Sequence, residues 1–314
     1  MRGTLHLFAA DDVPTIAAAL AYGRRDMWRR PAWLRWFGLT EPEMERLIAG
    51  IGEVLDDGIP RTRAELSVEL GGRLGERAGE ALLGSWGSAL KIASDDEYLV
   101  QAAGEGSGVR FVRASRWVSG WRDEDPEAAF ASVVERYLAA YGPATQKELL
   151  RWWGVTRVVL LRPILERLGG RLTEVDVDGT RAYLRTEDVA AVEATSPKRG
   201  MAHLVGGFDP LTVGAGLRDR LIPPAQLKRV SRTAGWISPV VLLDGVVAGV
   251  WDSRQAAKGL TITVDPFDGP PASSVRRSIS AAAERVGGAH GLDVTVEYGR
   301  AYVTPKRAAP FHDR

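Results

Sequence analysis

Hydrophobic residues recur at helical spacing between residues 126 and 141, and this pattern predicts a helix over that range. A Gly-Pro pair follows at once and ends it. Thr145 then precedes Glu148 by three residues, the spacing of a capping box, so a second, short helix is predicted to start there. A third helix is predicted over 156–168, where two glycines stop it.

Two runs of strand-like composition come next, 171–177 and 180–185. Asp178-Gly179 joins them, and Asp-Gly between alternating apolar residues is a strong signal for a β-hairpin. A helix, a helix-turn-helix and a hairpin follow one another in the order of a winged helix. The second short helix of such a module is the one usually directed at DNA.

The same order of elements occurs earlier in the chain. A helix is predicted over 41–55, and Thr62 precedes Glu65 by three residues at the start of the next one. Gly71-Gly72 is expected to close that helix, a further helix is possible over 76–92, and a hairpin is expected over 98–113, with a glycine-rich tip. The repeat indicates tandem winged-helix modules.

The last third of the chain changes to short strand-like runs and turns. A hairpin is predicted over 238–250 around an Asp-Gly turn, and alternating runs at 260–264 and 292–298 predict further strands. An amphipathic helix is predicted over 275–286, and a linker over 190–200. The expected fold class is α+β, with tandem winged-helix modules followed by an antiparallel, β-barrel-like C-terminal domain.

Composition narrows the class of protein. The 314 residues are 45% hydrophobic and 26% charged, as in soluble globular proteins. No apolar run is long enough to cross a bilayer and no signal-peptide pattern is present, so a cytoplasmic location is expected. The absence of cysteine excludes disulfides, thiolate metal sites and cysteine nucleophiles. The net charge of +1 means that a nucleic-acid surface requires local clustering of cations.

Two stretches supply such clusters. One follows the short helix of the second module, and the other, over 218–232, has a single acidic residue and reads as a loop punctuated by glycine and proline. The candidate DNA contacts are Arg157, Arg162, Arg218, Arg220, Lys228, Arg229 and Arg232. Clustered basic side chains bind phosphates through charge and counterion release. A solvated face or structural salt bridges are the alternatives for these residues.

Other candidate groups give weaker patterns. Thr4 and His6 alternate on a short strand and point to one face, so they are weak catalytic candidates, with an ordinary hydrogen-bonded histidine as the alternative. Four dispersed histidines without cysteine do not predict a metal site, and no nucleotide-binding motif occurs, so no cofactor is expected. Asp209 is expected to cap the turn after it. The tryptophan-rich stretch 28–37 suits packing or a stacking platform.

Several strings resemble the AlkZ type of winged-helix DNA glycosylase. They are Arg2-Gly3-Thr4-Leu5-His6-Leu7, Tyr141-Gly142-Pro143-Ala144-Thr145, Gly207-Phe208-Asp209-Pro210-Leu211, Arg218-Asp219-Arg220 and the run 235–245. The resemblance covers essentially the whole chain. It implies a C-shaped arrangement of winged helices with a β-barrel domain, a monomer, duplex DNA as partner and no cofactor. It further implies removal of bulky or crosslinking alkylated bases by an activated water.

One departure from the family leaves two functions open. In the glycosylases, a glutamine-aliphatic-glutamine or glutamine-aliphatic-aspartate motif lies upstream of the Arg-Gly-Thr-x-His string, whereas none of the four glutamines here has glutamine or aspartate two residues later. Either the start codon is assigned too far downstream or the catalytic limb is lost. The chain is thus a glycosylase or a non-catalytic, regulatory DNA-binding protein. The expected domains are a first winged-helix remnant at 1–40, winged helices at 41–120 and 121–190, and the β-rich domain at 191–314.

Overall fold

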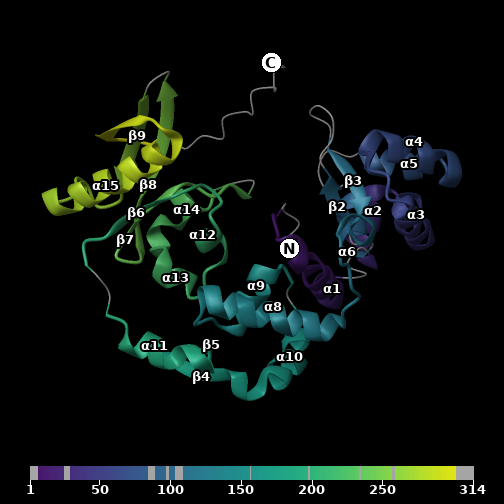
Figure 1. Cartoon of the computed structure of the whole chain (residues 1–314), viewed down its shortest axis with the longest axis horizontal. Coiled ribbons are helices and arrows are strands. Elements are labelled where there is room, and N and C mark those ends of the chain that lie inside the picture. Colours follow the sequence, from purple (N-terminus) through teal and green to yellow (C-terminus); the bar gives the residue numbers. More distant parts are fainter. Residues whose placement is uncertain are drawn as a thin grey trace. The chain divides into compact units, whose positions relative to one another are not determined.

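The computed structural model divides the chain into two compact units, which are described separately. Unit 1 comprises Met1–Tyr137 and Leu149–Leu172, and unit 2 comprises Leu138–Glu148 and Thr173–Arg314. The structure describes residues 6–24, 29–83, 89–96, 99–102, 109–155, 157–196, 199–232, 235–256 and 259–301. Figure 1 labels their helices and strands.

The N-terminal part of unit 1 is a helical layer beside a small sheet (Figure 1). Its helices are α1 (Val13–Arg24), α2 (Pro31–Phe37), α3 (Glu41–Val54), α4 (Arg63–Leu74), α5 (Glu76–Leu83), α6 (Ala89–Asp96) and α7 (Ala114–Trp117). Strands β1 (Arg61–Thr62), β2 (Leu99–Ala102) and β3 (Arg110–Arg113) pair in the antiparallel order β1-β3-β2. Fully buried Met44, Leu47 and Ile51 of α3 and Leu66 and Leu70 of α4 form the centre of its core.

The predicted helix stop at Gly71-Gly72 is wrong, because α4 continues through both glycines to Leu74. Gly71 instead allows α5 to approach α4 closely. The Cα of Gly79 in α5 lies opposite Gly71, and a Cβ on Gly79 would come within 2.8 Å of the Ser67 carbonyl oxygen in α4. The predicted capping box at Thr62 and Glu65 is confirmed.

Three helices of the second predicted module follow: α8 (Pro126–Tyr141), α9 (Gln146–Trp153) and α10 (Leu161–Leu168). The first two match the predicted ranges. The third was predicted from 156, but Val158–Leu160 forms a 3-10 turn and α10 starts only at Leu161. Pro163 explains the later start, since proline lacks an N–H and is tolerated only in the first turn of a helix. Within unit 1, the rings of Phe130 and Trp153 pack at a centroid distance of 5.0 Å.

The predicted hairpin around Asp178-Gly179 is confirmed. Strands β4 (Leu172–Val177) and β5 (Thr180–Arg185) flank a turn in which Asp178 has φ 48° and Gly179 has φ 80°. Positive φ at both central residues is the conformation that Asp-Gly favours. The backbones of Ala144 and Tyr183 form an isolated antiparallel bridge with N···O distances of 3.0 and 2.8 Å. Helix α11 (Val189–Ala194) occupies part of the predicted linker.

The C-terminal sheet is open and mixed, so the prediction of an antiparallel barrel is wrong. Strands β6 (Ala202–Val205), β7 (Val240–Leu243), β8 (Val246–Ala256), β9 (Gly259–Pro266) and β10 (Asp293–Tyr298) pair in the order β10-β9-β8-β7-β6. Within the described ranges, β6 and β10 are the two edges of this sheet. Helix α15 (Ser273–His290) connects β9 to β10 as a crossover, and a crossover returns the chain in parallel. The predicted hairpin over 238–250 is confirmed as β7–β8.

Alternating residues of β7 face two cores on opposite sides of this sheet. Val240 and Leu242 pack against the segment 210–230, whereas Val241 packs on the side of α15. The segment contains α12 (Pro210–Gly214), α13 (Arg218–Leu221) and α14 (Leu227–Val230), and it lies across the sheet from α15 (Figure 1). No described helix is both long and apolar enough to span a membrane.

Candidate nucleic-acid interface

The basic stretch 218–232 is a series of short helical turns and not the predicted loop. Asp209 caps α12, which precedes this stretch, because its Oδ1 accepts a hydrogen bond from the Leu211 N–H at 2.8 Å, as the sequence predicted. Buried Leu221, Ile222 and Val230 hold the stretch against the sheet. The charged side chains between these anchors therefore lie at or near the surface of unit 2.

Arg218 and Arg220 make contacts within unit 2. The Arg218 guanidinium donates to Ser231 Oγ. Arg220 forms an ion pair with Asp178 and donates to the Val177 carbonyl oxygen at 2.7 Å. Arg220 thus joins α13 to the turn of the β4–β5 hairpin. These contacts correspond to the structural alternative considered for the two residues.

The other three cations of the stretch differ in how they are engaged. Arg229 lies 2.8 Å from Asp265 Oδ2, and its guanidinium carbon stands 4.6 Å from the centroid of the Phe267 ring. Lys228 and Arg232 are exposed, and neither has an ion-pair partner among the described residues. Lys228 lies in α14 and Arg232 lies two residues after its end, and because both are exposed their charges are available to a ligand in solution.

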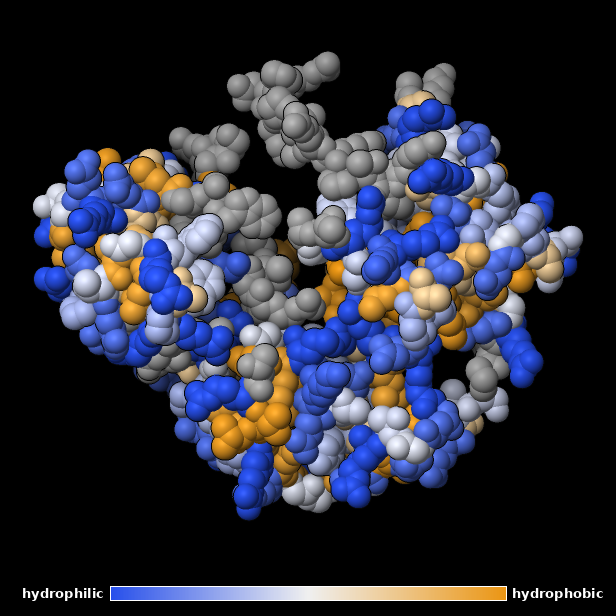
Figure 2. All heavy atoms as spheres, turned by 180° about the vertical axis from the view of Figure 1, so that it is seen from behind, coloured by the Kyte–Doolittle hydropathy of each residue, from blue (hydrophilic) through white to orange (hydrophobic). Residues whose placement is uncertain are grey.

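The two arginines of unit 1 lie at the start of the 3-10 turn before α10 and in the first turn of α10. Arg157 is exposed at the start of the 3-10 turn, and the next two residues, Val158 and Val159, are 57% and 66% exposed. Arg162 pairs with Glu166 at 2.9 Å, with side chains 83% and 65% exposed. A pair this exposed contributes about 0–1 kcal/mol and opens readily. On the face in Figure 2, hydrophilic residues cover most of the described surface, with hydrophobic residues in separate groups between them.

The two catalytic candidates stay predictions. Thr4 lies outside the described residues. His6 is exposed, and its ring stacks on Phe8 with a centroid distance of 5.7 Å and an interplanar angle of 22°. Among the described residues, no group of three or more His, Cys, Asp or Glu side chains could hold a metal ion.

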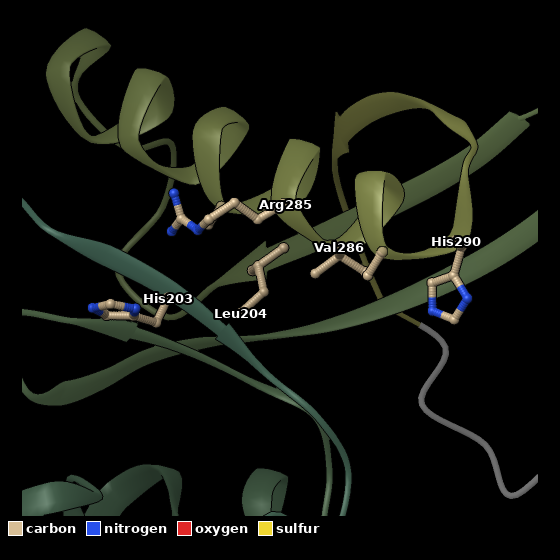
Figure 3. A pocket seen from close by; sticks show the side chains of 7 residues that line it. His203, Leu204, Arg285, Val286 and His290 are labelled. Carbon is tan, nitrogen blue, oxygen red and sulfur yellow. The ribbon is translucent and has the colours of Figure 1, made fainter.

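A pocket of about 350 Å³ lies in unit 2 between β6 and α15 (Figure 3). Leu204 and Val286 contribute to its apolar lining, and Figure 3 shows His203 and Arg285 toward one end and His290 at the other. The described residues that line it include no carboxylate or amide to hold a water. The pocket therefore suits a small anion better than hydrolytic chemistry.

The sequence analysis missed one buried ion pair in unit 1. Arg24 Nε of α1 lies 2.9 Å from Asp95 Oδ2 of α6, and the side chains are only 9% and 16% exposed. Burial raises the pKa of the Asp95 carboxyl, while the Arg24 charge opposes that rise. No local pattern could have indicated the pair, because 71 residues separate its members. The sequence analysis also did not predict the capping box of α3, although its Thr40-x-x-Glu43 spacing is visible in the sequence.

Comparison with known proteins gives the family. The sequence profile described as "DNA glycosylase AlkZ-like" matches residues 1–289. The chain is 36% identical over 258 residues to the "Interstrand DNA cross-link repair glycosylase" of Streptomyces sahachiroi. The aligned region covers 80% of this chain and 68% of that protein. The chain belongs to the AlkZ-like DNA glycosylase family. Its structure superposes on that of Streptomyces sahachiroi DNA glycosylase AlkZ with a TM-score of 0.83 and 32% identity, over 95% of this chain and 80% of the other.

Membership of the AlkZ-like family confirms the resemblance drawn from the short motifs. It supports a DNA-repair glycosylase function, with DNA as the partner. The mixed α and β composition expected for the family is also confirmed. The seven predicted DNA contacts stay predictions, and the structure divides them into exposed cations and cations engaged within a unit.

Proposed function

We propose that this AlkZ-like protein binds duplex DNA as a monomer in the cytoplasm and removes alkylated or crosslinked bases. The observation that carries the proposal is the likeness to AlkZ over 95% of the chain at a TM-score of 0.83. The Streptomyces sahachiroi relative named for interstrand cross-link repair supports the substrate class.

The reaction is hydrolysis of an N-glycosyl bond. A bond forms between a water oxygen and C1′ of the deoxyribose, and the C1′–N9 bond breaks with its electron pair passing to the base. The water gives up one proton, and the other stays on the new hydroxyl. An N7-alkylguanine is positively charged, so it leaves as a neutral base, and the protein has mainly to position water and stabilise the oxocarbenium-like transition state. Thr4 and His6 stay the catalytic candidates.

We infer that residues 41–120 and 121–190 are both winged-helix modules. In each, a short extended segment before the second helix pairs with the last strand of the hairpin. This segment is β1, paired with β3, in the first module and Ala144, bridged to Tyr183 of β5, in the second. The occurrence of the same pairing in both segments supports the assignment.

Within this proposal, Lys228, Arg232 and Arg157 are the first candidates for phosphate contacts, because they are exposed and lack an ion-pair partner among the described residues. Arg162 joins them when its pair with Glu166 opens. We propose that Arg218, Arg220 and Arg229 act mainly by holding the 218–232 stretch in place.

The decisive experiment measures base release. The purified chain is incubated with a duplex that carries one N7-methylguanine, and alkali then converts abasic sites into strand breaks. Breaks above those in buffer, and none in the unmodified duplex, are expected. Salt-sensitive binding of the same duplex without breaks would instead favour a non-catalytic DNA-binding protein. The absence of both would overturn the proposal.

A further inference from the structure

Phe208 has an unusual backbone conformation for a bulky residue. Its φ is 59°, and it occupies the third position of a turn in which the Asp209 N–H lies 3.4 Å from the Gly206 carbonyl oxygen. Positive φ at that position normally selects glycine or asparagine. An aromatic side chain is therefore present at a position where the backbone favours a residue with little or no side chain.

The residues on both sides hold this conformation. A Cβ on Gly207 would lie 3.2 Å from the Ile237 carbonyl oxygen, so the chain passes close beneath the 235–239 segment. On the other side, Asp209 is fixed as the cap of α12, and buried Thr212 donates to the Asp209 carbonyl oxygen at 2.9 Å. Because neither neighbour is free to rotate, Phe208 cannot relax to negative φ without disrupting both contacts.

The ring of Phe208 is only partly used in packing. It makes an edge-on contact with Trp236 at a centroid distance of 5.0 Å and an interplanar angle of 82°. The residue is nevertheless 49% exposed. In an edge-on contact only the edge of one ring touches the face of the other, and about half of the Phe208 side chain stays exposed to solvent. Core packing alone therefore does not account for the aromatic side chain.

Two exposed cations lie in the segment that pairs with the Trp236 backbone. The backbone N–H of Arg232 donates to the Trp236 carbonyl oxygen at 2.8 Å, which joins the Arg232 backbone to that of the residue whose ring Phe208 touches. Lys228 lies in α14, which ends two residues before Arg232. An exposed ring beside exposed positive charges is the combination that binds an unstacked base together with its phosphate.

We propose that Phe208 is a base-stacking residue, on which one unstacked base of bound DNA lies while Lys228 and Arg232 contact the adjoining backbone. This inference rests on the proposed DNA binding. It assigns a contact to the Gly-Phe-Asp-Pro motif, and it explains why an aromatic residue is present at a glycine-type position. A base is favoured over an apolar protein surface because the flanking charges match a polyanion.

The test compares Phe208→Leu with Phe208→Tyr. Leucine keeps an apolar, bulky side chain against Trp236 but removes the ring, whereas tyrosine keeps the ring. Each full-length variant is titrated into a short duplex that carries one unpaired 2-aminopurine, whose fluorescence falls when it stacks on an aromatic ring. Phe208→Leu should weaken binding about five- to 150-fold and abolish the quenching, and Phe208→Tyr should keep both. The slope of affinity against salt should stay unchanged, because phosphate contacts are untouched.

The outcomes separate this inference from the proposed function. Salt-sensitive binding by the unmodified protein, with equal affinity and quenching in Phe208→Leu, would overturn the stacking role and leave DNA binding intact. No duplex binding by the unmodified protein would overturn the proposed function itself. If Phe208→Leu does not fold, quenching by the unmodified protein decides the question, since bound 2-aminopurine without quenching excludes stacking on Phe208.

Discussion

The Glu148 carboxylate accepts a hydrogen bond from the backbone N–H of Arg218 at 3.0 Å, across 70 residues of sequence. It also accepts from the Thr145 N–H and from Thr145 Oγ1, both at 2.9 Å. A helix cap thereby fixes the start of the basic stretch. Gly216 also holds the start of the basic stretch close to this cap, because a Cβ at Gly216 would lie 2.5 Å from the Pro143 carbonyl oxygen. In unit 2, the segment 141–145 therefore packs against the residues at the start of α13.

Replacing Glu148 with alanine should lower the free energy of unfolding by about 2 kcal/mol, because the helix loses a cap and the Arg218 N–H loses its acceptor. Glu65→Ala is the matched control. Glu65 closes the equivalent box with Thr62, and its only distant partner among the described residues is the exposed Arg110 guanidinium at 3.4 Å, a pair that contributes about 0–1 kcal/mol. Denaturant unfolding of both variants measures the difference. Equal losses would show that the Arg218 contact contributes no more than that exposed ion pair.

The glycines of α4 and α5 should respond in opposite directions. Gly72→Ala should raise the free energy of unfolding by about 0.5–1 kcal/mol, because nothing lies within 4 Å of the new Cβ and alanine favours a helix. Gly79→Ala should lower it by about 1–3 kcal/mol, because the Cβ would collide with the Ser67 carbonyl oxygen at 2.8 Å. Thermal melts of the two variants check the signs. A stabilising Gly79→Ala would refute the close helix contact.

The double variant Lys228→Ala/Arg232→Ala should weaken duplex binding for all sequences. It should also reduce the slope of log affinity against log salt by about 0.9 for each phosphate that the variant no longer neutralises. Arg276→Ala/Arg277→Ala removes the same charge from α15, on the other face of the sheet and outside the pocket lining. That control should change the slope little. Fluorescence anisotropy at several salt concentrations measures both, and equal slopes in the two double variants would contradict the assignment.

The stability contributed by Asp57 should depend on pH. Hydrogen bonds from Arg61, at 2.8 and 2.6 Å, and from the Ile59 N–H hold the pKa of the Asp57 carboxyl down at about 2, below its ordinary value of 3.8. A depressed carboxyl pKa stabilises the folded state above the unfolded pKa, and this stabilisation is lost as pH falls through the folded pKa. Asp57→Asn should therefore melt at a lower temperature than the unmodified protein at pH 7. The difference in melting temperature between the two proteins should disappear between about pH 4 and pH 2. A difference that does not change with pH would show that the Asp57 charge is not its cause.

Local signals predicted most of the elements. Helix α8, the hairpin turns at Asp178-Gly179 and Asp244-Gly245, and the caps at Thr62 and Thr145 depend on neighbouring residues only, and all were readable from the sequence. The short motifs were also sufficient for the family, which the comparisons confirmed. These features are determined within a few residues of chain, so no tertiary information is needed for them.

Contacts between distant residues decided the rest. Gly71 lies in the contact between α4 and α5, where Gly79 approaches it, and the last strand returns parallel to β9 through the crossover α15 and so does not close a barrel. The sequence by itself determined that residues 218–232 carry a basic cluster. Only the tertiary structure decided which of those cations are engaged by Asp178, Asp265 and Ser231 and which, at Lys228 and Arg232, stay exposed, because a charge is available to DNA only where folding brings no counter-charge to it.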